Sequence, residues 1–320
     1  MQLKVNRESS LISYCKNSIG YLYKNYYKRN KQKNKNLVVF CYHDITDMPT
    51  KFQIENHLYT TTATFIKQIK WIEKNFKIIN PRDGWGNEEG ASIKTRPMAI
   101  ITFDDGFYGA FFNGIKYLIE MKIPSIMFLN MKNIIDGTPL ISSACLYLEN
   151  EIKINKTTQK KRHSKQLHLQ IDPNSYHKYN FILQNKCNDI VEYQGKLVNI
   201  DVLKKFDNPR LISYGNHLYE HYNSIALSNN ELVSSYQKNE MELKKFKSYS
   251  SFFAYTNGRF GSCWNENTLK VIKQCGAEKI FSADGKINQN GNNFLLDRIA
   301  LNENHNNDNK LFYTVFRGMS

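Results

Sequence analysis

Short apolar runs rich in β-branched and aromatic residues alternate along this chain with segments whose apolar residues recur every three or four positions. Strands that alternate with helices form a largely parallel sheet, because each helix returns the chain to the start of the next strand. The pattern therefore predicts an α/β protein. The expected strands cover residues 37–41, 76–79, 98–103, 125–129, 211–214, 252–255, 279–282 and 294–301.

Polar side chains follow several of these strands at the point where each strand ends. His43 comes after the first strand, Asp104 and Asp105 after the third, and His217 and His221 after the fifth. In a parallel barrel the carboxyl ends of the strands share one face, so we expect these residues to converge there. An open parallel sheet would also gather them at one edge, so the convergence alone does not select a barrel.

The first cluster is a pair of adjacent carboxylates, Asp104 and Asp105, followed by Gly106. Two carboxylates this close are costly to keep ionised together unless a cation holds one of them. A metal ion on one would leave the other free to act as a base. The alternative is an ordinary turn at the end of a strand, with aspartates that cap a helix.

The second cluster is a histidine pair, His217 and His221, separated by four residues. This spacing is expected to put two imidazoles on one side of a helical turn. Neutral imidazole binds zinc and other late transition metals. A lone pair of this kind is more often a surface coincidence. With an aspartate it supplies three protein ligands and an open position, which is typical of a catalytic zinc site.

These residues resemble the motifs of the NodB-like polysaccharide deacetylases, a family of carbohydrate esterases. The T-F-D-D-G motif is present unchanged at residues 102–106, and the H-[ST]-x-x-H motif is present at residues 217–221 with Leu218 replacing the hydroxyl residue. Residues 255–258 (Y-T-N-G) resemble Y-P-x-G but lack its proline and the arginine that usually precedes it and orients the base. Tyr-His at residues 42–43 and Asp-Arg-Ile at 297–299 also match one branch of the family.

The resemblance implies a fold, an activity and a set of roles. The fold would be a distorted (β/α)7-type barrel. The activity would be metal-dependent removal of N-acetyl groups from an amino sugar of a surface polysaccharide or its precursor. Asp105, His217 and His221 would hold the metal, most plausibly zinc, with cobalt or nickel as alternatives. Asp104 would be the general base, and the backbone N–H of Tyr255 would stabilise the oxyanion together with the metal.

The proton donor for the departing amine is less well defined by the motifs. The late L-x-H motif that supplies it in many relatives is absent after Arg298. His43 is the preferred candidate, with a packed structural imidazole as the alternative reading. Asp104 returning its own proton is another route, and His305 is a weaker candidate in an asparagine-rich stretch. A second functional hypothesis is a catalytically weak or inactive relative that only binds glycans.

The chain divides into three expected parts. Residues 1–36 form a basic amphipathic N-terminal segment, residues 37–302 the barrel with a helical insertion at 145–210, and residues 303–320 a C-terminal segment. Residues 9–27 have apolar residues at helical spacing and precede a run of lysines. This helix is expected either to lie on an anionic membrane or to pack against its own domain.

Composition restricts the remaining alternatives. A chain of 320 residues with 41% hydrophobic residues can bury a full core. The net charge of +15 resides largely in the N-terminal segment and the insertion, and no nucleic-acid motif accompanies it, so no specific nucleic-acid partner is expected. Six cysteines without a C-x-x-C pair are expected to be reduced thiols. Neither a secretory signal nor a membrane-spanning run is recognised, so a cytoplasmic protein is expected, with peripheral membrane contact possible.

Overall fold

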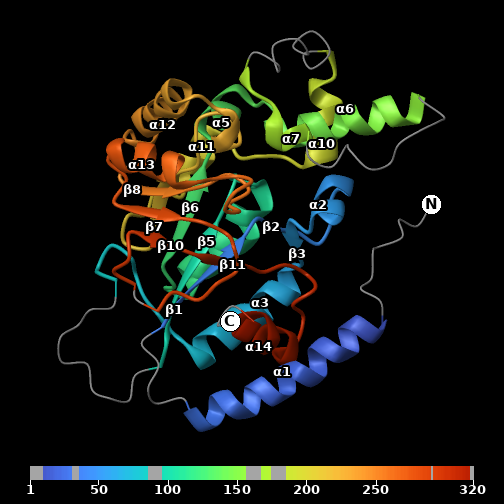
Figure 1. Ribbon diagram of the computed structural model, residues 1–320, viewed down its shortest axis with the longest axis vertical. Helices are drawn as coiled ribbons and strands as arrows, with labels where there is room; N and C mark the ends of the chain where they lie inside the picture. Colours follow the sequence, from blue (N-terminus) through green and yellow to red (C-terminus); the bar gives the residue numbers. More distant parts are fainter. Residues whose placement is uncertain are drawn as a thin grey trace.

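The computed structural model describes residues 10–30, 36–85, 96–155, 167–173, 185–289 and 291–317. Its centre is a parallel sheet with the strand order β10-β9-β8-β7-β6-β5-β1-β11, in which β4 also pairs with the start of β5 (Figure 1). The strands are β1 (Leu37–Tyr42), β4 (Lys77–Ile78), β5 (Met98–Phe103), β6 (Ser125–Leu129), β7 (Ile212–Asn216), β8 (Tyr249–Ala254), β9 (Lys279–Phe281), β10 (Leu295–Leu296) and β11 (Arg298–Ala300).

The two ends of this strand order are joined by a single stretch of chain. Leu295 and Leu296 pair with β9, whereas Arg298–Ala300 pairs with β1, and Asp297 alone separates the two. The sheet therefore curls into a nearly closed barrel. If β10 and β11 are taken as one interrupted strand, the eight strands of the order occupy seven positions. The predicted (β/α)7-type barrel is confirmed.

Alternation along the strands separates the inside of the barrel from its outside. Leu37, Val39, Ile100, Phe128 and Leu296 belong to a buried cluster inside the barrel. Their neighbours in sequence, such as Val38, Phe40 and Ile101, belong to a larger cluster beneath the outer helices. Because successive side chains in a strand point to opposite faces, residues 41, 43, 104 and 298 follow the inward series toward the carboxyl end. The period of two thus aims the polar residues into the mouth of the barrel.

Helices surround the barrel on its outer side. They are α1 (Ser10–Asn30), α2 (Lys51–Asn56), α3 (Thr62–Asn75), the π-helix η1 (Ala110–Ile115), α4 (Lys116–Glu120), α5 (Met131–Asp136), α6 (Ile141–Asn155), α7 (Leu167–Gln170), α10 (Cys187–Gln194), α11 (Ile200–Lys205), the 3-10 helix η3 (Ser224–Ala226), α12 (Asn229–Leu243), α13 (Glu266–Gln274) and α14 (Asp308–Arg317). Side-chain caps from Thr61, Ser228 and Asn265 begin α3, α12 and α13.

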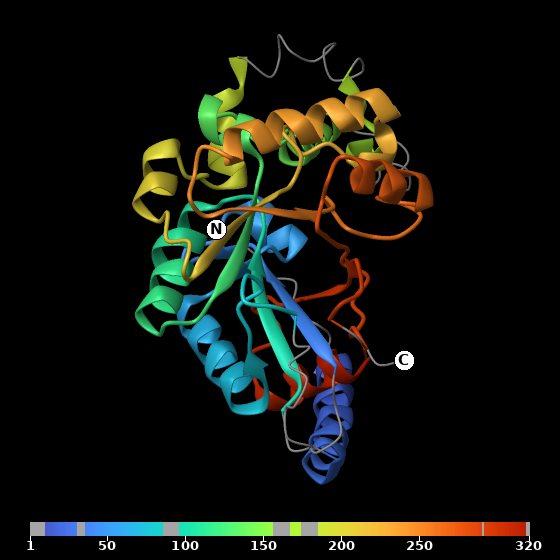
Figure 2. The same cartoon turned by 90° about the vertical axis from the view of Figure 1, so that its left-hand side faces the viewer.

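The expected insertion lies between β6 and β7. Its described parts are helical, and α6, α7 and α10 gather at one end of the barrel in both views, whereas α1 lies at the other end (Figures 1 and 2). The predicted helical signal at residues 176–183 and the lysine clusters at 31–35 and 160–165 lie outside the described residues. The domain boundaries at 36, 302 and within the insertion stay predictions.

The N-terminal helix packs on the domain through a narrow face. Tyr23 stacks on Phe316 of α14 with ring centroids 5.1 Å apart, and a Cβ added to Gly20 would lie 1.9 Å from the carbonyl oxygen of Asn309. Ile12, Ile19 and Leu22 are 52%, 41% and 67% exposed. Of the two expected alternatives, the structure shows the helix packed against its own domain. Most of its apolar stripe nevertheless faces solvent. None of the described helices combines the length and apolar character needed to cross a bilayer.

Candidate active site

The two aspartates occupy a sharp turn at the carboxyl end of β5. The N–H of Asp104 donates to the carbonyl of Tyr42 and continues the pairing with β1. Asp105 and Gly106 then adopt left-handed backbone angles, with φ of 70° and 82°. A Cβ on Gly106 would lie 3.0 Å from Leu129, so this position requires glycine for space as well as for its backbone. The turn directs both carboxylates into the barrel mouth, where both residues are 3% exposed.

The histidine pair lies in a loop, and the prediction of a helical turn was wrong. No helix is assigned between β7 and η3, and both Leu218 and His221 have left-handed backbone angles, with φ of 62° and 56°. A bulky leucine in this region is strained, and such strain persists only where the surroundings over-determine it. The imidazoles therefore meet because the loop folds back on itself, with ring centroids 5.2 Å apart.

A buried asparagine network holds this loop in place. The amide nitrogen of Asn239 donates to the side-chain oxygen of Asn216 and to the carbonyl of Leu129, both at 2.8 Å. The side-chain oxygen of Asn216 also accepts from the N–H of Leu218 at 2.9 Å. Asn130 donates to the carbonyls of His217 and Leu218. These bonds support a loop whose motif hydroxyl is replaced by Leu218. Nothing in the sequence indicated these hydrogen bonds, because asparagine is frequent throughout the chain.

Asp105, His217 and His221 converge on one point. Their ligand atoms lie within 4.8 Å of one another. Oδ1 of Asp105 lies 3.1 Å from Nε2 of His221 and 3.6 Å from Nε2 of His217. Ligands of one tetrahedral zinc ion are separated by about 3.4 Å, given zinc–nitrogen and zinc–oxygen bonds of about 2.1 Å. The three atoms therefore fit a single ion.

The protonation of the trio also suits a cation. Nδ1 of His217 lies 2.8 Å from the carbonyl oxygen of Ala254, which makes Nδ1 the donor and leaves the lone pair of Nε2 facing Asp105. Burial lowers the pKa of His217 to about 4, so its contacts with the aspartates are not ion pairs at neutral pH. Oδ1 of Asp105 is buried without a hydrogen-bond partner. A buried carboxylate oxygen without a donor fits a metal ligand.

The second carboxylate, Asp104, is held by an arginine from the closing strand. Nη1 of Arg298 donates to Oδ1 of Asp104 at 2.7 Å, and Nε of Arg298 donates to the carbonyl of Ser282 at 3.0 Å. Burial alone would raise the pKa of Asp104, but the Arg298 guanidinium, together with His217 and His43, outweighs burial and the net pKa is lowered. Asp104 is therefore ionised at neutral pH. The orienting arginine that the Y-T-N-G segment lacks comes from elsewhere in the chain.

These residues line one cavity of about 300 Å³. His43 is half-buried and lines it, as the sequence predicted for a residue at the end of β1. Leu140, Ser142 and Leu146 add a wall at the beginning of α6. The cavity thus has a polar floor made by strand ends and a partly apolar side made by α6.

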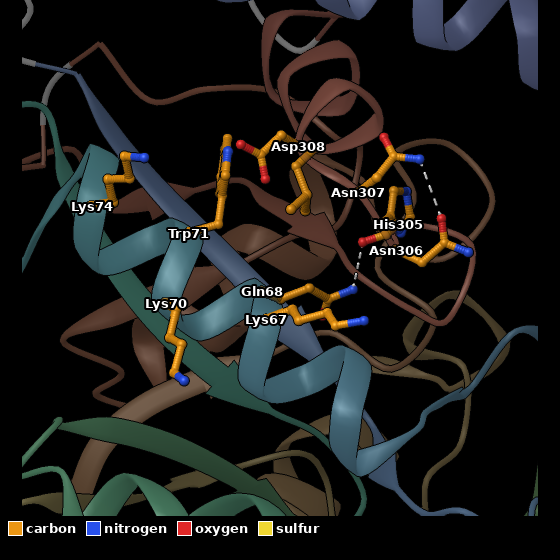
Figure 3. A pocket seen from close by; sticks show the side chains of 10 residues that line it. Lys67, Gln68, Lys70, Trp71, Lys74, His305, Asn306, Asn307 and Asp308 are labelled. Atoms are coloured by element: carbon orange, nitrogen blue, oxygen red, sulfur yellow. Dashed lines mark hydrogen bonds between the residues drawn. The ribbon is translucent and has the colours of Figure 1, made fainter.

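A second cavity of similar volume lies between α3 and the segment before α14 (Figure 3). Lysines at 67, 70 and 74 line it together with Trp71 and His305. His305 accepts a hydrogen bond from the N–H of Asn302 through Nδ1 and does not line the cavity of Asp104. The structure therefore gives no support to His305 as a proton donor.

The expected role of Tyr255 requires correction. Its backbone N–H donates to the carbonyl of Phe281 at 3.0 Å, as part of the pairing between β8 and β9. Its ring lies outside the barrel, stacked on Trp264 with centroids 5.4 Å apart. A donor already used in the sheet is not available to an oxyanion in this conformation.

Comparisons with solved structures find proteins of the same fold. The fold matches Streptococcus pyogenes deacetylase PplD, solved in complex with acetate, with a TM-score of 0.58 and 12% identity over 88% of this chain and 98% of that one. IcaB from Ammonifex degensii gives a TM-score of 0.57 and 14% identity over 88% and 99%. A de-N-acetylase from Aggregatibacter actinomycetemcomitans gives 0.56 and 13% over 88% and 100%. At these identities the likeness shows a shared fold.

Sequence comparisons name the family. A search of curated proteins found no match. The polysaccharide deacetylase family model matches residues 91–280, which is more than half of the chain. The matched range includes Asp104 and the trio of Asp105, His217 and His221. The chain belongs to the polysaccharide deacetylase family of carbohydrate N-deacetylases.

Proposed function

We propose that the chain is a metal-dependent hydrolase that removes N-acetyl groups from an amino sugar of a surface polysaccharide or its precursor. One observation carries the proposal: the Asp105, His217 and His221 ligand atoms lie within 4.8 Å of one another beside a second carboxylate that an arginine holds in the same cavity. Metal-dependent hydrolysis needs both features, because the trio would bind the cation and the second carboxylate would accept a proton from water.

Asp105, His217 and His221 would hold the ion. Two imidazoles and a carboxylate are a zinc set, and cobalt or nickel accept the same ligands. When bound, the ion supplies a Lewis acid that polarises the acetamide carbonyl and acidifies a water molecule. Asp104 accepts the proton of that water through Oδ2, because Oδ1 is engaged by Arg298. Arg298 keeps the carboxylate ionised and oriented.

The departing amine needs a proton, for which His43 is our candidate. It lines the cavity and offers a nitrogen within 4.8 Å of a side-chain oxygen of Asp104. Asp104 returning its own proton is the alternative route. Replacing His43 with glutamine distinguishes the two routes. If His43 is the proton donor, its loss should lower turnover strongly and leave substrate binding unchanged. Turnover close to that of the parent would leave Asp104 to do both.

Acetate release tests the activity. The metal-free protein would be supplied with Zn²⁺, Co²⁺ or Ni²⁺ and assayed on defined N-acetylated oligosaccharides, with Asp104→Asn as the inactive control. We expect metal-dependent release that the control lacks. A glycan-binding protein without catalysis is the alternative, and metal binding with saturable glycan binding but no acetate release would support it. Arg298 weakens that alternative, because it orients Asp104 in place of the arginine that the Y-T-N-G segment lacks.

We further propose that α1 contacts an anionic membrane. Its exposed residues Ile12, Ile19 and Leu22 form an apolar stripe, and the lysine run follows the helix in the sequence. The helix lies at the end of the barrel opposite the insertion, which would leave the active site facing away from the bilayer (Figure 2). The cytoplasmic location expected from the sequence stays a prediction that cell fractionation would test.

Vesicle sedimentation tests the membrane contact. Replacing Ile19 and Leu22 with glutamate should abolish sedimentation with anionic vesicles and spare hydrolysis of a soluble oligosaccharide. Replacing Met48 and Met241 with glutamate is the control, since these residues are 89% and 60% exposed away from α1 and together receive the same charge. Equal sedimentation of both variants would reject the contact.

A further inference from the structure

A second group of potential metal ligands lies beside the proposed catalytic trio. Cys41, His43 and Asp104 each offer one ligand atom, and these atoms lie within 4.8 Å of one another. We infer that these three residues form a second, inhibitory zinc site, whose occupation removes Asp104 from catalysis. The inference rests on the proposed role of Asp104 as the general base.

The three residues are brought together by the strands themselves. Cys41 and His43 continue the inward series of β1, and Asp104 continues that of the neighbouring strand β5. All three line the same cavity, so an ion that reaches one site can reach the other. Sγ of Cys41 lies 3.5 Å from Oδ2 of Asp104. A tetrahedral zinc ion separates its sulfur and oxygen ligands by about 3.6 Å.

The ligand chemistry selects zinc over magnesium or calcium. A thiolate, an imidazole and a carboxylate are the ligands that zinc prefers, whereas magnesium and calcium prefer oxygen alone. Cys41 binds as the thiolate, and its proton leaves to the solvent. The thiolate and the carboxylate together balance the two charges of the ion. The occupied site therefore carries no net charge beside the Arg298 guanidinium.

Asp104 can join this site without losing its arginine. Its two oxygens face different partners, because Oδ1 accepts from Arg298 at 2.7 Å whereas Oδ2 faces Cys41. Oδ2 is the oxygen that would accept the proton of the attacking water. A zinc ion on Oδ2 occupies the lone pair that the reaction needs. The first equivalent of zinc should therefore activate the enzyme, and an excess should inhibit it.

A zinc titration of acetate release tests the inhibition. Starting from metal-free protein, we expect activity to rise with the first equivalent and then to fall by roughly 100-fold at saturating zinc, the lower end of what a positioned general base contributes. Each variant is normalised to its own maximum. Cys41→Ser should shift the inhibitory midpoint to at least roughly tenfold higher zinc, given the weak affinity of a neutral hydroxyl for zinc. Cys187→Ser, on α10, should inhibit as the parent does. Equal inhibition of the parent and Cys41→Ser overturns the inference.

Cobalt gives a readout that is independent of activity. The proposed catalytic trio has no sulfur ligand, so a thiolate-to-cobalt charge-transfer band should appear only with the second equivalent of Co²⁺. The band should be absent from Cys41→Ser and should persist in Cys187→Ser. In His217→Ala, which removes a ligand of the first trio, the band should appear with the first equivalent.

Metal counts separate the two proposals. Native mass spectrometry should find two zinc ions in the parent and one in Cys41→Ser. If no substrate releases acetate, a second zinc ion and the cysteine-dependent band would still support the second site. A single ion in the parent, or a band that survives Cys41→Ser, overturns it whatever the activity.

Discussion

Removal of the Arg298 guanidinium should destabilise the folded protein and leave the carboxylate of Asp104 without the group that orients it. The side chain of Arg298 is 1% exposed and that of Asp104 is 5% exposed, with 2.7 Å between Nη1 and Oδ1. Breaking a buried pair leaves an uncompensated charge and typically costs about 3–5 kcal/mol. We therefore expect Arg298→Met to lower the free energy of unfolding by about that amount. Arg210→Met, on the exposed surface, should change it by less than about 0.5 kcal/mol.

The pH dependence gives the sign of the effect. Arg298, with smaller contributions from His217 and His43, holds the pKa of Asp104 below its ordinary value of 3.8 despite burial. The pair therefore stabilises the protein above pH 3.8, and this contribution is lost as the pH falls through the lowered pKa. Without the guanidinium, only the two imidazoles oppose the effect of burial, so the pKa of Asp104 should be higher in Arg298→Met than in the parent. The stability gap between the parent and Arg298→Met should therefore be widest near neutral pH and should narrow as the solution becomes acidic.

Urea unfolding of the metal-free proteins measures both effects. In a double-mutant cycle with Asp104→Asn, the double variant should lose less stability than the sum of the single variants, by about 1–3 kcal/mol. Arg298→Lys keeps the charge but cannot reach Asp104 and the carbonyl of Ser282 together, so it should fall between the parent and Arg298→Met. Additive single variants, or a gap that does not change with pH, would refute the reasoning.

Four further outcomes are expected. Asp104→Asn should lower acetate release by roughly 10²–10⁴-fold, although it should retain one equivalent of added zinc as the parent does by elemental analysis, and normal turnover would remove Asp104 as the base. A chelator should abolish activity of the parent until zinc is restored, whereas His217→Ala should not recover. Asn239→Ala should cost about 1–3 kcal/mol by urea unfolding and weaken zinc binding, unlike the exposed Asn267→Ala. In the metal-free protein the pKa of His217 is lowered from 6.5 to about 4 by burial, so stability present above pH 6.5 should be lost as the pH falls toward 4; an equally steep loss in His217→Gln would contradict this.

Sequence reasoning predicted the strands best where both faces are buried. The bounds of β5 and β6 match the apolar runs 98–103 and 125–129, because every residue of these strands except Met98 is buried. The run 294–301 was expected to be one strand, but it divides at Asp297. The carboxylate of Asp297 accepts from the N–H groups of Asp284 and Lys286, which breaks the ladder there. The two-residue strands β2 (Asp44–Ile45) and β3 (Tyr59–Thr60) were missed because so short a pairing leaves no period to detect.

The sequence motifs predicted the residues that form the site, but not the contacts that hold those residues in place. The motifs identified Asp104, Asp105 and the two histidines, because these residues are adjacent or closely spaced. Arg298 lies 194 residues from its partner in sequence, so only the closed barrel brings them together. The histidine spacing suggested a helical turn, since a four-residue interval reads the same whether it arises from a helix or from a loop with left-handed residues. The asparagine network was equally invisible, because nothing local distinguishes Asn216 or Asn239.

Arg298 belongs to β11, the strand that closes the barrel against β1. Closure of the barrel and placement of the guanidinium beside Asp104 therefore occur together. A ribosome-bound chain that has emerged only as far as β9 would already hold every proposed ligand of the catalytic metal, yet its Asp104 would still lack the cation that orients it. Such a chain is expected to be inactive until β11 has been synthesised and has paired with β1. A fragment truncated before β11 would keep the three proposed metal ligands in its sequence but would lack Arg298, so any zinc that it binds should not support hydrolysis.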